Sequence, residues 1–408
     1  MSEQRPAMLS LEEALERLLG AVTPLTEREL VPTAEALGRV LAADVISMLD
    51  VPPADNSSMD GYALRVVDVP LVGTILPVSQ RVPAGMVGRA LQAGTAARIF
   101  TGAQIPLGAD AVVMQEECEV IAGEGLGSVR VNATLATGQN LRRRGEDVQR
   151  GATVLAAGHR LDAAALGHAA SVGAARLPVA RRVRVALFST GDELAMPGEP
   201  LKPGAIYNSN RFTLRALLQG LGCEVVDLGI VPDQREATRA ALREAAAQAD
   251  LIVTSGGVSV GEEDHLRPAV QAEGRLDLWQ IAIKPGKPLA FGQVRKAWFI
   301  GLPGNPVSSL VTFLMLVRPV VLRLQGAVRL TPNRFRLRAD FAWAKPDRRR
   351  EFLRARLNGQ GGLELFPNQG SGVLTSAVWG DGLVDNPAAQ AIAQGDSVNF
   401  IPFSELLA

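Results

Sequence analysis

The stretch from residue 181 to residue 327 alternates short apolar runs with helix-length segments, and this alternation restricts the possible folds more than any other feature of the chain. Apolar runs bounded by turn residues predict buried strands, and the longer segments between them have the apolar spacing of helices. Strands separated by helices form βαβ units and a largely parallel sheet. The predicted strands are 183–188, 224–228, 251–254 and 297–300, and the predicted helices are 209–220, 235–248 and 306–324. The sequence therefore predicts a doubly wound, mostly parallel α/β domain over residues 181–327.

The rest of the chain predicts smaller domains of other kinds. Ser10 and Glu13 have the spacing of a capping box, which predicts a helix from Leu11, and a second helix is expected over 33–42. Residues 46–146 are rich in Gly and Pro and contain short β-type runs, as in a small all-β domain. We expect a discontinuous helical linking domain (1–45 and 147–180), an inserted β domain (46–146) and a C-terminal β-barrel-like domain (328–408).

Composition excludes several classes of protein. Lys and Arg together number 42, as do Asp and Glu, so no net charge draws the chain to nucleic acid or to a membrane surface. The longest apolar run, 310–317, is far shorter than the ~20 residues of a membrane span, and no secretory signal is recognisable. Only two cysteines and three histidines are present, so any bound metal is expected to be a hard ion held by oxygen. These features predict a cytoplasmic protein without a nucleic-acid or membrane partner.

Three loops of unusual composition directly follow predicted strands of the α/β domain. They span 189–193, 255–261 and 301–306, and the first two are rich in Gly, Ser and Thr. Ligands of doubly wound sheets bind at the carboxyl ends of the strands, where glycines let backbone N–H groups approach phosphate oxygens. The loops could also be ordinary turns, but three in one domain favour a binding site. They match neither the Walker pattern nor the dinucleotide fingerprint, which argues against a standard NTPase or dehydrogenase.

Charged side chains stand in or near these loops. Lys284 and Lys287 lie in a turn stiffened by two prolines, which suits an anion site, although a solvated surface turn has equal odds. Acidic residues occur at Asp192, Glu193, Asp233 and 262–264, where they can hold Mg²⁺ beside phosphate oxygens. Glu262 and Glu263 have a structural explanation, because acids at a helix start stabilise the helix dipole, so Glu193 and Asp264 are the better metal candidates.

The β domain and the cysteines give weaker signals. The polar turn 55–63 and the arginines 142–144 need no function to explain them, because such turns and solvated faces are common. Cys118 and Cys223 have no histidine nearby in the sequence and are interpreted as packing residues.

The full series of motifs resembles one known family. The motifs lie, in order, at 55–63, 101–103, 144–147, 189–194, 255–261, 284–288 and 301–308, with a looser match at 349–352 and 370–372. Together they resemble the MoeA family of molybdopterin molybdenumtransferases, whose animal relative is the C-terminal domain of gephyrin. Gln104 and Ala54 depart from the family pattern, but neither lies at an expected ligand position.

The resemblance implies an activity and a set of site residues. Molybdate would be inserted into adenylylated molybdopterin with Mg²⁺-dependent release of AMP, and the enzyme would be a homodimer that also contacts other proteins of molybdenum-cofactor synthesis. The implied catalytic residues are Asp60, Thr101, Asp147, Glu193 and Asp264, of which Glu193 and Asp264 would hold Mg²⁺. The implied nucleotide or substrate contacts are Thr190, Gly191, Asp192, Asp233, Ser255, Gly256, Gly257, Pro303 and Pro306. The implied molybdate contacts are Lys284, Lys287, Ser308, Arg350 and Ser371.

By the same resemblance, Asp60, Thr101 and Asp147 would face the nucleotide domain of a second subunit. Two other functions compete with this interpretation. One is a nucleotide pyrophosphatase built on the same α/β domain, and the other is a scaffold that binds a peptide near its C-terminal domain. The complete motif set, with both acids and both lysines, favours the transferase.

Overall fold

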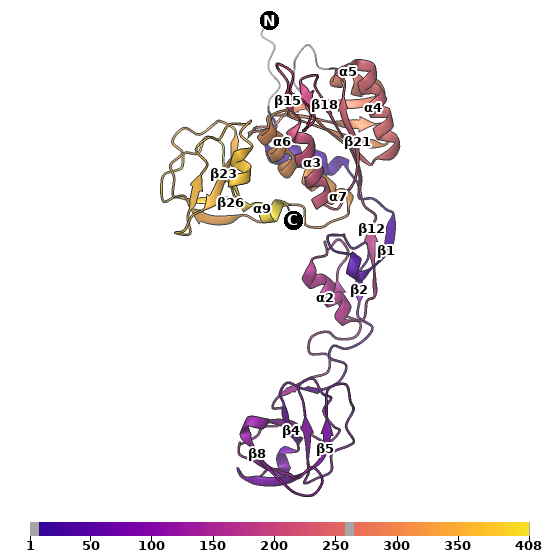
Figure 1. Ribbon diagram of the computed structural model, residues 1–408, viewed down its shortest axis with the longest axis vertical. Helices are drawn as coiled ribbons and strands as arrows, with labels where there is room; N and C mark the ends of the chain where they lie inside the picture. The colour runs from indigo at the N-terminus through magenta and orange to yellow at the C-terminus, as the bar shows by residue number, and fades with distance from the viewer. Residues whose placement is uncertain (1–7, 258–264, 408) are drawn as a thin grey trace.

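The protein is elongated, with the inserted β domain at one end and the α/β and C-terminal domains together at the other (Figure 1). The computed structural model describes residues 8–257 and 265–407. A narrow linking region joins the two ends, and the chain passes through it twice (Figure 1).

The α/β domain contains a sheet of six strands. Their order is β16 (Glu224–Val231), β13 (Arg184–Thr190), β17 (Leu251–Ser255), β21 (Ala297–Leu302), β20 (Pro288–Val294) and β18 (Gly274–Gln280). The first four strands are mutually parallel, whereas β20 and β18 form an antiparallel edge. The sheet is therefore mixed, with its parallel part where the sequence predicts it.

Helices cover both faces of this sheet because side chains alternate along each strand. Val185 and Leu187 of β13 join the core beneath α3 (Ser209–Gly220), while Ala186 and Phe188 join the core beneath α4 (Arg235–Gln248). The first face also receives α1 (Leu11–Ala21), α6 (Pro306–Thr312) and α7 (Arg318–Leu324), and the second receives α5 (Leu266–Glu273). The bounds of α3 and α4 agree with those predicted from the sequence.

The segment Pro306–Leu324 forms one continuous helical rod. A π-helical turn, Phe313–Val317, joins α6 to α7. By length and hydropathy alone this rod could cross a membrane, but 94% of its apolar 18-residue window is buried inside the protein. Its apolar character is accounted for by packing against the sheet and α1.

The linking region differs from the helical domain that we expected. Residues 33–42 form only a short 3-10 turn, Thr33–Glu35, after which Gly38 takes the left-handed conformation (φ 73°) and interrupts any helix. The region is built from the ribbon β1 (Arg28–Pro32) with β12 (Arg176–Ala180), the pair β2 (Val45–Ile46) with β11 (Thr153–Leu155), and α2 (Ala163–Ser171). The predicted capping box at Ser10 is confirmed, but α1 packs against α7 in the α/β domain.

The inserted domain and the C-terminal domain are each built on a six-stranded sheet. The inserted sheet has the order β7 (Ala111–Met114), β4 (Gly61–Leu64), β6 (Ala96–Ile99), β5 (Thr74–Val82), β9 (Ser128–Val131) and β8 (Cys118–Ile121). The C-terminal sheet has the order β19 (Ile283–Lys284), β23 (Arg350–Leu357), β25 (Gly382–Asn386), β26 (Ser397–Pro402) and β22 (Phe335–Arg338), with β24 (Leu363–Leu365) beside β23. Strand β19 comes from the α/β domain, so the two domains share a sheet at this point.

Candidate functional site

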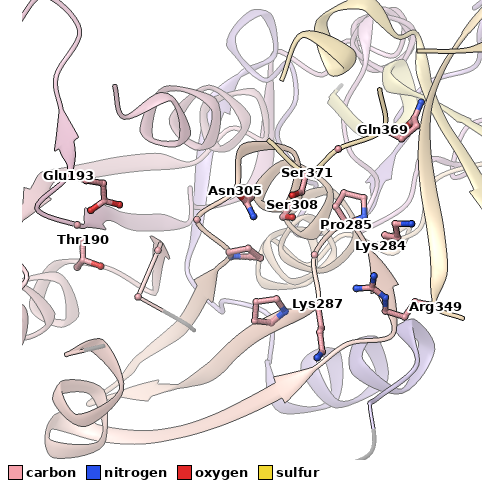
Figure 2. Close-up of a pocket in the computed structure, with 18 of the residues that line it drawn as sticks. Thr190, Glu193, Lys284, Pro285, Lys287, Asn305, Ser308, Arg349, Gln369 and Ser371 are labelled. Carbon is pink, nitrogen blue, oxygen red and sulfur yellow. The ribbon is translucent and has the colours of Figure 1, made fainter. Parts of the chain in front are cut away.

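A cavity of about 660 Å³ lies between the carboxyl edge of the parallel strands and the C-terminal domain. Because the four parallel strands end at one edge of the sheet, the loops that follow them meet there. The last residue of β13 and eight residues of these loops line the cavity: Thr190, Gly191, Glu193, Asp233, Gly256, Gly257, Pro303, Gly304 and Asn305. Figure 2 shows Thr190 and Glu193 at one end of the cavity and Lys284, Arg349 and Gln369 at the other.

The glycine loop after β17 approaches the first loop closely. Gly257 has φ 66°, and a Cβ atom built on it would lie 2.9 Å from Thr190 Oγ1. Any side chain at this position would therefore strain the backbone and displace the loop. The loop is thus shaped so that bare backbone lines the cavity, as a phosphate site requires.

Ser255 lies behind this surface and does not line the cavity. Its hydroxyl is buried and accepts a 2.7 Å hydrogen bond from the side-chain amide of Asn210. The same amide donates to the Gly304 carbonyl at 2.7 Å, so Asn210 fastens the loops after β17 and β21 to α3. Sequence reasoning missed Asn210 because a polar residue in the first turn of a helix has no distinctive spacing.

Carboxylates gather at the Thr190 end of the cavity. Glu193 and Asp233 both line it, and the Asp192 carboxylate accepts the backbone N–H of Asp233 at 3.2 Å, which ties the two loops together. Asp192 itself does not line the cavity, and Asp264 lies outside the described residues. Within the described part of the chain no group of three or more metal-binding side chains occurs. Two carboxylates still fit Mg²⁺, which takes its other ligands from phosphate and water.

The opposite end of the cavity is cationic because two strands from different domains pair there. The parallel pairing of β19 with β23 places Lys284 opposite Glu351. Lys284 Nζ lies 3.2 Å from Glu351 Oε1 and 3.4 Å from Asp347 Oδ2. Glu351 is fully buried, and its other oxygen accepts the Trp343 indole N–H at 2.8 Å. This carboxylate is therefore fixed, and it holds the ammonium group of Lys284 at the cavity wall.

Arg349 contributes its guanidinium group to the cavity, whereas the side chain of Arg350 is directed away from it. Arg349 lines the cavity and is held by Asp347, which accepts its Nε–H and Nη2–H groups at 3.0 Å each. These hydrogen bonds hold the pKa of Asp347 well below its usual range. Arg350 is ion-paired with Asp385 and Glu12 and does not line the cavity. The structure thus places Arg349, and not the predicted Arg350, at the anion end of the cavity: Arg349 lies just before β23 begins and is held by Asp347, whereas Arg350, the first residue of β23, is held by Asp385.

Two serines complete this end of the cavity. Ser308 is buried in the first turn of α6, and Ser371 comes from the C-terminal domain. The Ser371 carbonyl accepts the Val307 N–H at 2.9 Å, so the C-terminal loop is docked on the start of α6. Lys287 and Pro303 also line the cavity, whereas Pro306, at the first position of α6, does not. Lining residues that sequence reasoning left out are Pro285, Gly286, Pro288, Gly304, Asn305, Gln369 and Gly370, most of them inside the motifs already noted.

The predicted residues of the inserted domain do not line this cavity. Asp60 Oδ1 accepts the backbone N–H and the hydroxyl of Thr101 at 2.8 Å each, which lowers the pKa of Asp60. Asp147 is exposed, and its backbone N–H donates to Val51 where the domain joins the linking region. The domain that carries Asp60 and Thr101 lies at the far end of the molecule from the α/β domain (Figure 1).

Comparisons with known proteins cover nearly the whole chain. Residues 9–173 match the MoeA N-terminal region (domain I and II), residues 186–323 a probable molybdopterin binding domain, and residues 336–403 the MoeA C-terminal region (domain IV). The chain is 40% identical to the molybdopterin molybdenumtransferase of Haemophilus influenzae, over 98% of this chain and 100% of that protein. It is 38% identical to molybdopterin molybdenumtransferase 2 of Mycobacterium tuberculosis H37Rv, over 87% of this chain and 88% of that protein. The crystal structure of the molybdopterin biosynthesis moeA protein from Pyrococcus horikoshii OT3 has a TM-score of 0.83 and 29% identity, covering 97% of this chain and 100% of that one.

The fold and these relatives together define a multidomain enzyme of molybdenum-cofactor biosynthesis, and the cavity at the carboxyl edge of its α/β domain is its candidate site. Its curated relatives are named as transferases, and it is an enzyme of that class. The chain belongs to the MoeA family, since the family regions and the relatives at 38–40% identity span most of its length.

Proposed function

We propose that this enzyme inserts molybdate into the dithiolene of adenylylated molybdopterin and releases AMP in a Mg²⁺-dependent reaction. The observation that carries the proposal is the division of one cavity into two ends of different chemistry. Glycine backbone and carboxylates lie at one end, and Lys284, Lys287 and Arg349 lie at the other. A pyrophosphatase would need the first end alone, so the second, cationic end favours a reaction with a second anion.

Each end suits one substrate. Gly256 and Gly257 present backbone to the phosphates of the adenylate, and Glu193 would hold Mg²⁺ there. Its predicted partner Asp264 lies outside the described residues, and Asp233 is a further carboxylate that lines this end. When bound, Mg²⁺ would supply charge neutralisation on the phosphate oxygens. Lys284, Lys287, Arg349, Ser308 and Ser371 surround the other end with donors, which suits a tetrahedral dianion such as molybdate. Asp347 and Glu351 keep two of these cations in place before the substrate arrives.

The long separation of the inserted domain from the cavity supports a homodimer with composite sites. Asp60, Thr101 and Asp147 do not line the cavity of their own chain, so a role in catalysis would require the cavity of a second subunit. The two free thiols and the balanced charge are consistent with a cytoplasmic enzyme. Contact with other proteins of cofactor synthesis follows from the proposed reaction, whose substrate another enzyme must supply.

Measurement of AMP release from adenylyl-molybdopterin at increasing molybdate concentration tests the proposal. Glu193→Gln removes one charge at nearly constant volume from the phosphate end, so AMP release should fall at every molybdate concentration. Lys287→Ala should leave adenylate binding unchanged and raise the molybdate concentration needed for half-maximal release by roughly tenfold to a hundredfold, the value of one charge-assisted contact. Release of AMP by the wild-type enzyme at an unchanged rate without molybdate would instead favour a pyrophosphatase.

A further inference from the structure

A second cavity, of about 400 Å³, lies where the linking region, α7 and the C-terminal helix α9 (Phe403–Leu407) meet. Among the residues that the structure describes, it shares no lining residue with the cavity at the sheet edge. The two cavities contact opposite halves of the helical rod, at Ser308 and at Arg318. Ten residues of helix separate these positions by about 15 Å. The second cavity is therefore a distinct place in the molecule.

Three arginines line this cavity, and two of them lack a carboxylate partner among the described residues. Arg318 is only 8% exposed and donates to the backbone carbonyls of Leu330 (3.3 Å) and Glu405 (2.8 Å). Arg160 donates to the Gly220 carbonyl at 3.1 Å. The Nε atoms of both side chains are buried and have no hydrogen-bond partner in the described chain. Buried polar groups are nearly always satisfied, so these two donors call for an explanation.

The charges around the cavity do not balance. Its carboxylates are Asp162, which caps α2 by accepting the Ala165 N–H at 2.8 Å, and Glu405, which accepts from Arg329 at 3.3 Å and from Asn333. Three guanidinium groups line the cavity with these two acids, so among the described residues the positive charges are in excess. Burial, together with the nearby charge of Arg160, lowers the pKa of Arg318 to about 10. A guanidinium group that is buried beside a second positive charge is stabilised by an anion that enters the cavity.

We propose that the cavity formed by Arg160, Arg318 and Arg329 binds a phosphate-class oxyanion, either inorganic phosphate or the phosphate group of a small monoester. Guanidinium groups are well suited to this ligand because they present several N–H donors to its oxygens. The volume of about 400 Å³ leaves room for such an anion and for water. A bound anion would contact the linking region, α7 and the segment before the C-terminal domain at once, and so stabilise the contact between these three parts. The proposal does not depend on the reaction at the first cavity.

The test uses the full-length protein and two probes, inorganic phosphate and AMP, at an ionic strength held constant with chloride. Binding is followed by calorimetry and by the rise in Tm. Because the first cavity also attracts anions, the experiments are done in a Lys287→Ala, Arg349→Ala background. We expect phosphate to bind this background and to raise its Tm in a saturable manner. Because the glycine loop of the first cavity remains, the second cavity is identified by the part of the binding that the arginine variants remove.

Arg160→Gln and Arg329→Gln, each added to that background, should weaken phosphate binding by roughly tenfold or more per lost charge-assisted contact. Arg329 is 64% exposed, so its replacement leaves the fold intact and the test decisive. Arg28→Gln, an exposed arginine of the linking region that lies outside this cavity, is the matched control and should bind as the background does. Binding of AMP that Arg160→Gln and Arg329→Gln weaken, as they weaken phosphate binding, would identify a monoester site, and weakening of phosphate binding alone would identify a free-anion site. Absence of binding in the background, or equal binding in the two arginine variants and the control, would overturn the proposal.

Discussion

Replacement of Arg349 and replacement of its neighbour Arg350 should have different consequences, although the sequence gives no reason to distinguish the two residues. Arg349 lines the cavity, so Arg349→Ala removes a donor from the anion end. A charge-assisted contact contributes about 1.5–3 kcal/mol, so the molybdate concentration for half-maximal AMP release should rise roughly tenfold to a hundredfold. Stability should change little, because the Arg349 partner, Asp347, also lies 3.4 Å from Lys284. Arg349→Lys keeps the charge but not the two-pronged contact with Asp347, and should give an intermediate value.

Arg350→Ala should instead affect stability and leave molybdate dependence unchanged. Its partner Asp385 is 1% exposed, and loss of one member of a buried pair typically costs about 3–5 kcal/mol. Arg334 also contacts Asp385, at 2.8 Å, so we expect a cost nearer the lower limit, about 3 kcal/mol, seen as a lower Tm. AMP release at varied molybdate and thermal unfolding of both variants make the comparison. A rise in the molybdate requirement of Arg350→Ala at unchanged Tm, with Arg349→Ala behaving as wild type, would refute this assignment.

Three further predictions concern the support of the site, the thiols and the assembly. Glu351→Gln removes the buried charge that holds Lys284, so it should raise the molybdate requirement several-fold while adenylate binding, measured by calorimetry, stays the same; a selective loss of adenylate binding would contradict this role. Burial raises the pKa of Cys118 to about 11 and that of Cys223 to about 12, so both thiols are protonated at neutral pH. Alkylation of these thiols should therefore become fast only as the pH rises toward these values. The double Cys→Ser variant should keep most of the activity. If Asp60 acts in the cavity of a second subunit, a mixture of inactive Asp60→Asn and Glu193→Gln proteins should regain partial activity when the subunits exchange. No recovery in a mixture whose subunit exchange has been demonstrated would argue for sites within one chain.

The sequence by itself determined the α/β domain and the position of its site. Strand and helix patterns are local, so the apolar runs and helical spacing predicted α3 and α4 with their observed bounds. Parallel strands end at one edge of a sheet, so the loops at Thr190, Gly256 and Pro303 had to meet once these strands were recognised. The lysine turn belonged to the same motif series, and both of its lysines line the cavity.

Only the tertiary structure decided which side chains face the cavity and what holds them. The pairing of β19 with β23 joins residues more than sixty positions apart, and this register, which no local pattern encodes, places Lys284 beside Glu351. Arg350 is the first residue of β23 and is held by Asp385, whereas Arg349, one residue earlier, is held by Asp347 at the cavity, so one position in the motif separates their roles. The linking region was mispredicted for a similar reason: the apolar residues of 33–42 are buried by strand pairing across the chain, with Leu41 opposite Val179, and not by a helix of their own. Long-range pairing fixes these orientations because the buried surface it creates outweighs local helical preference.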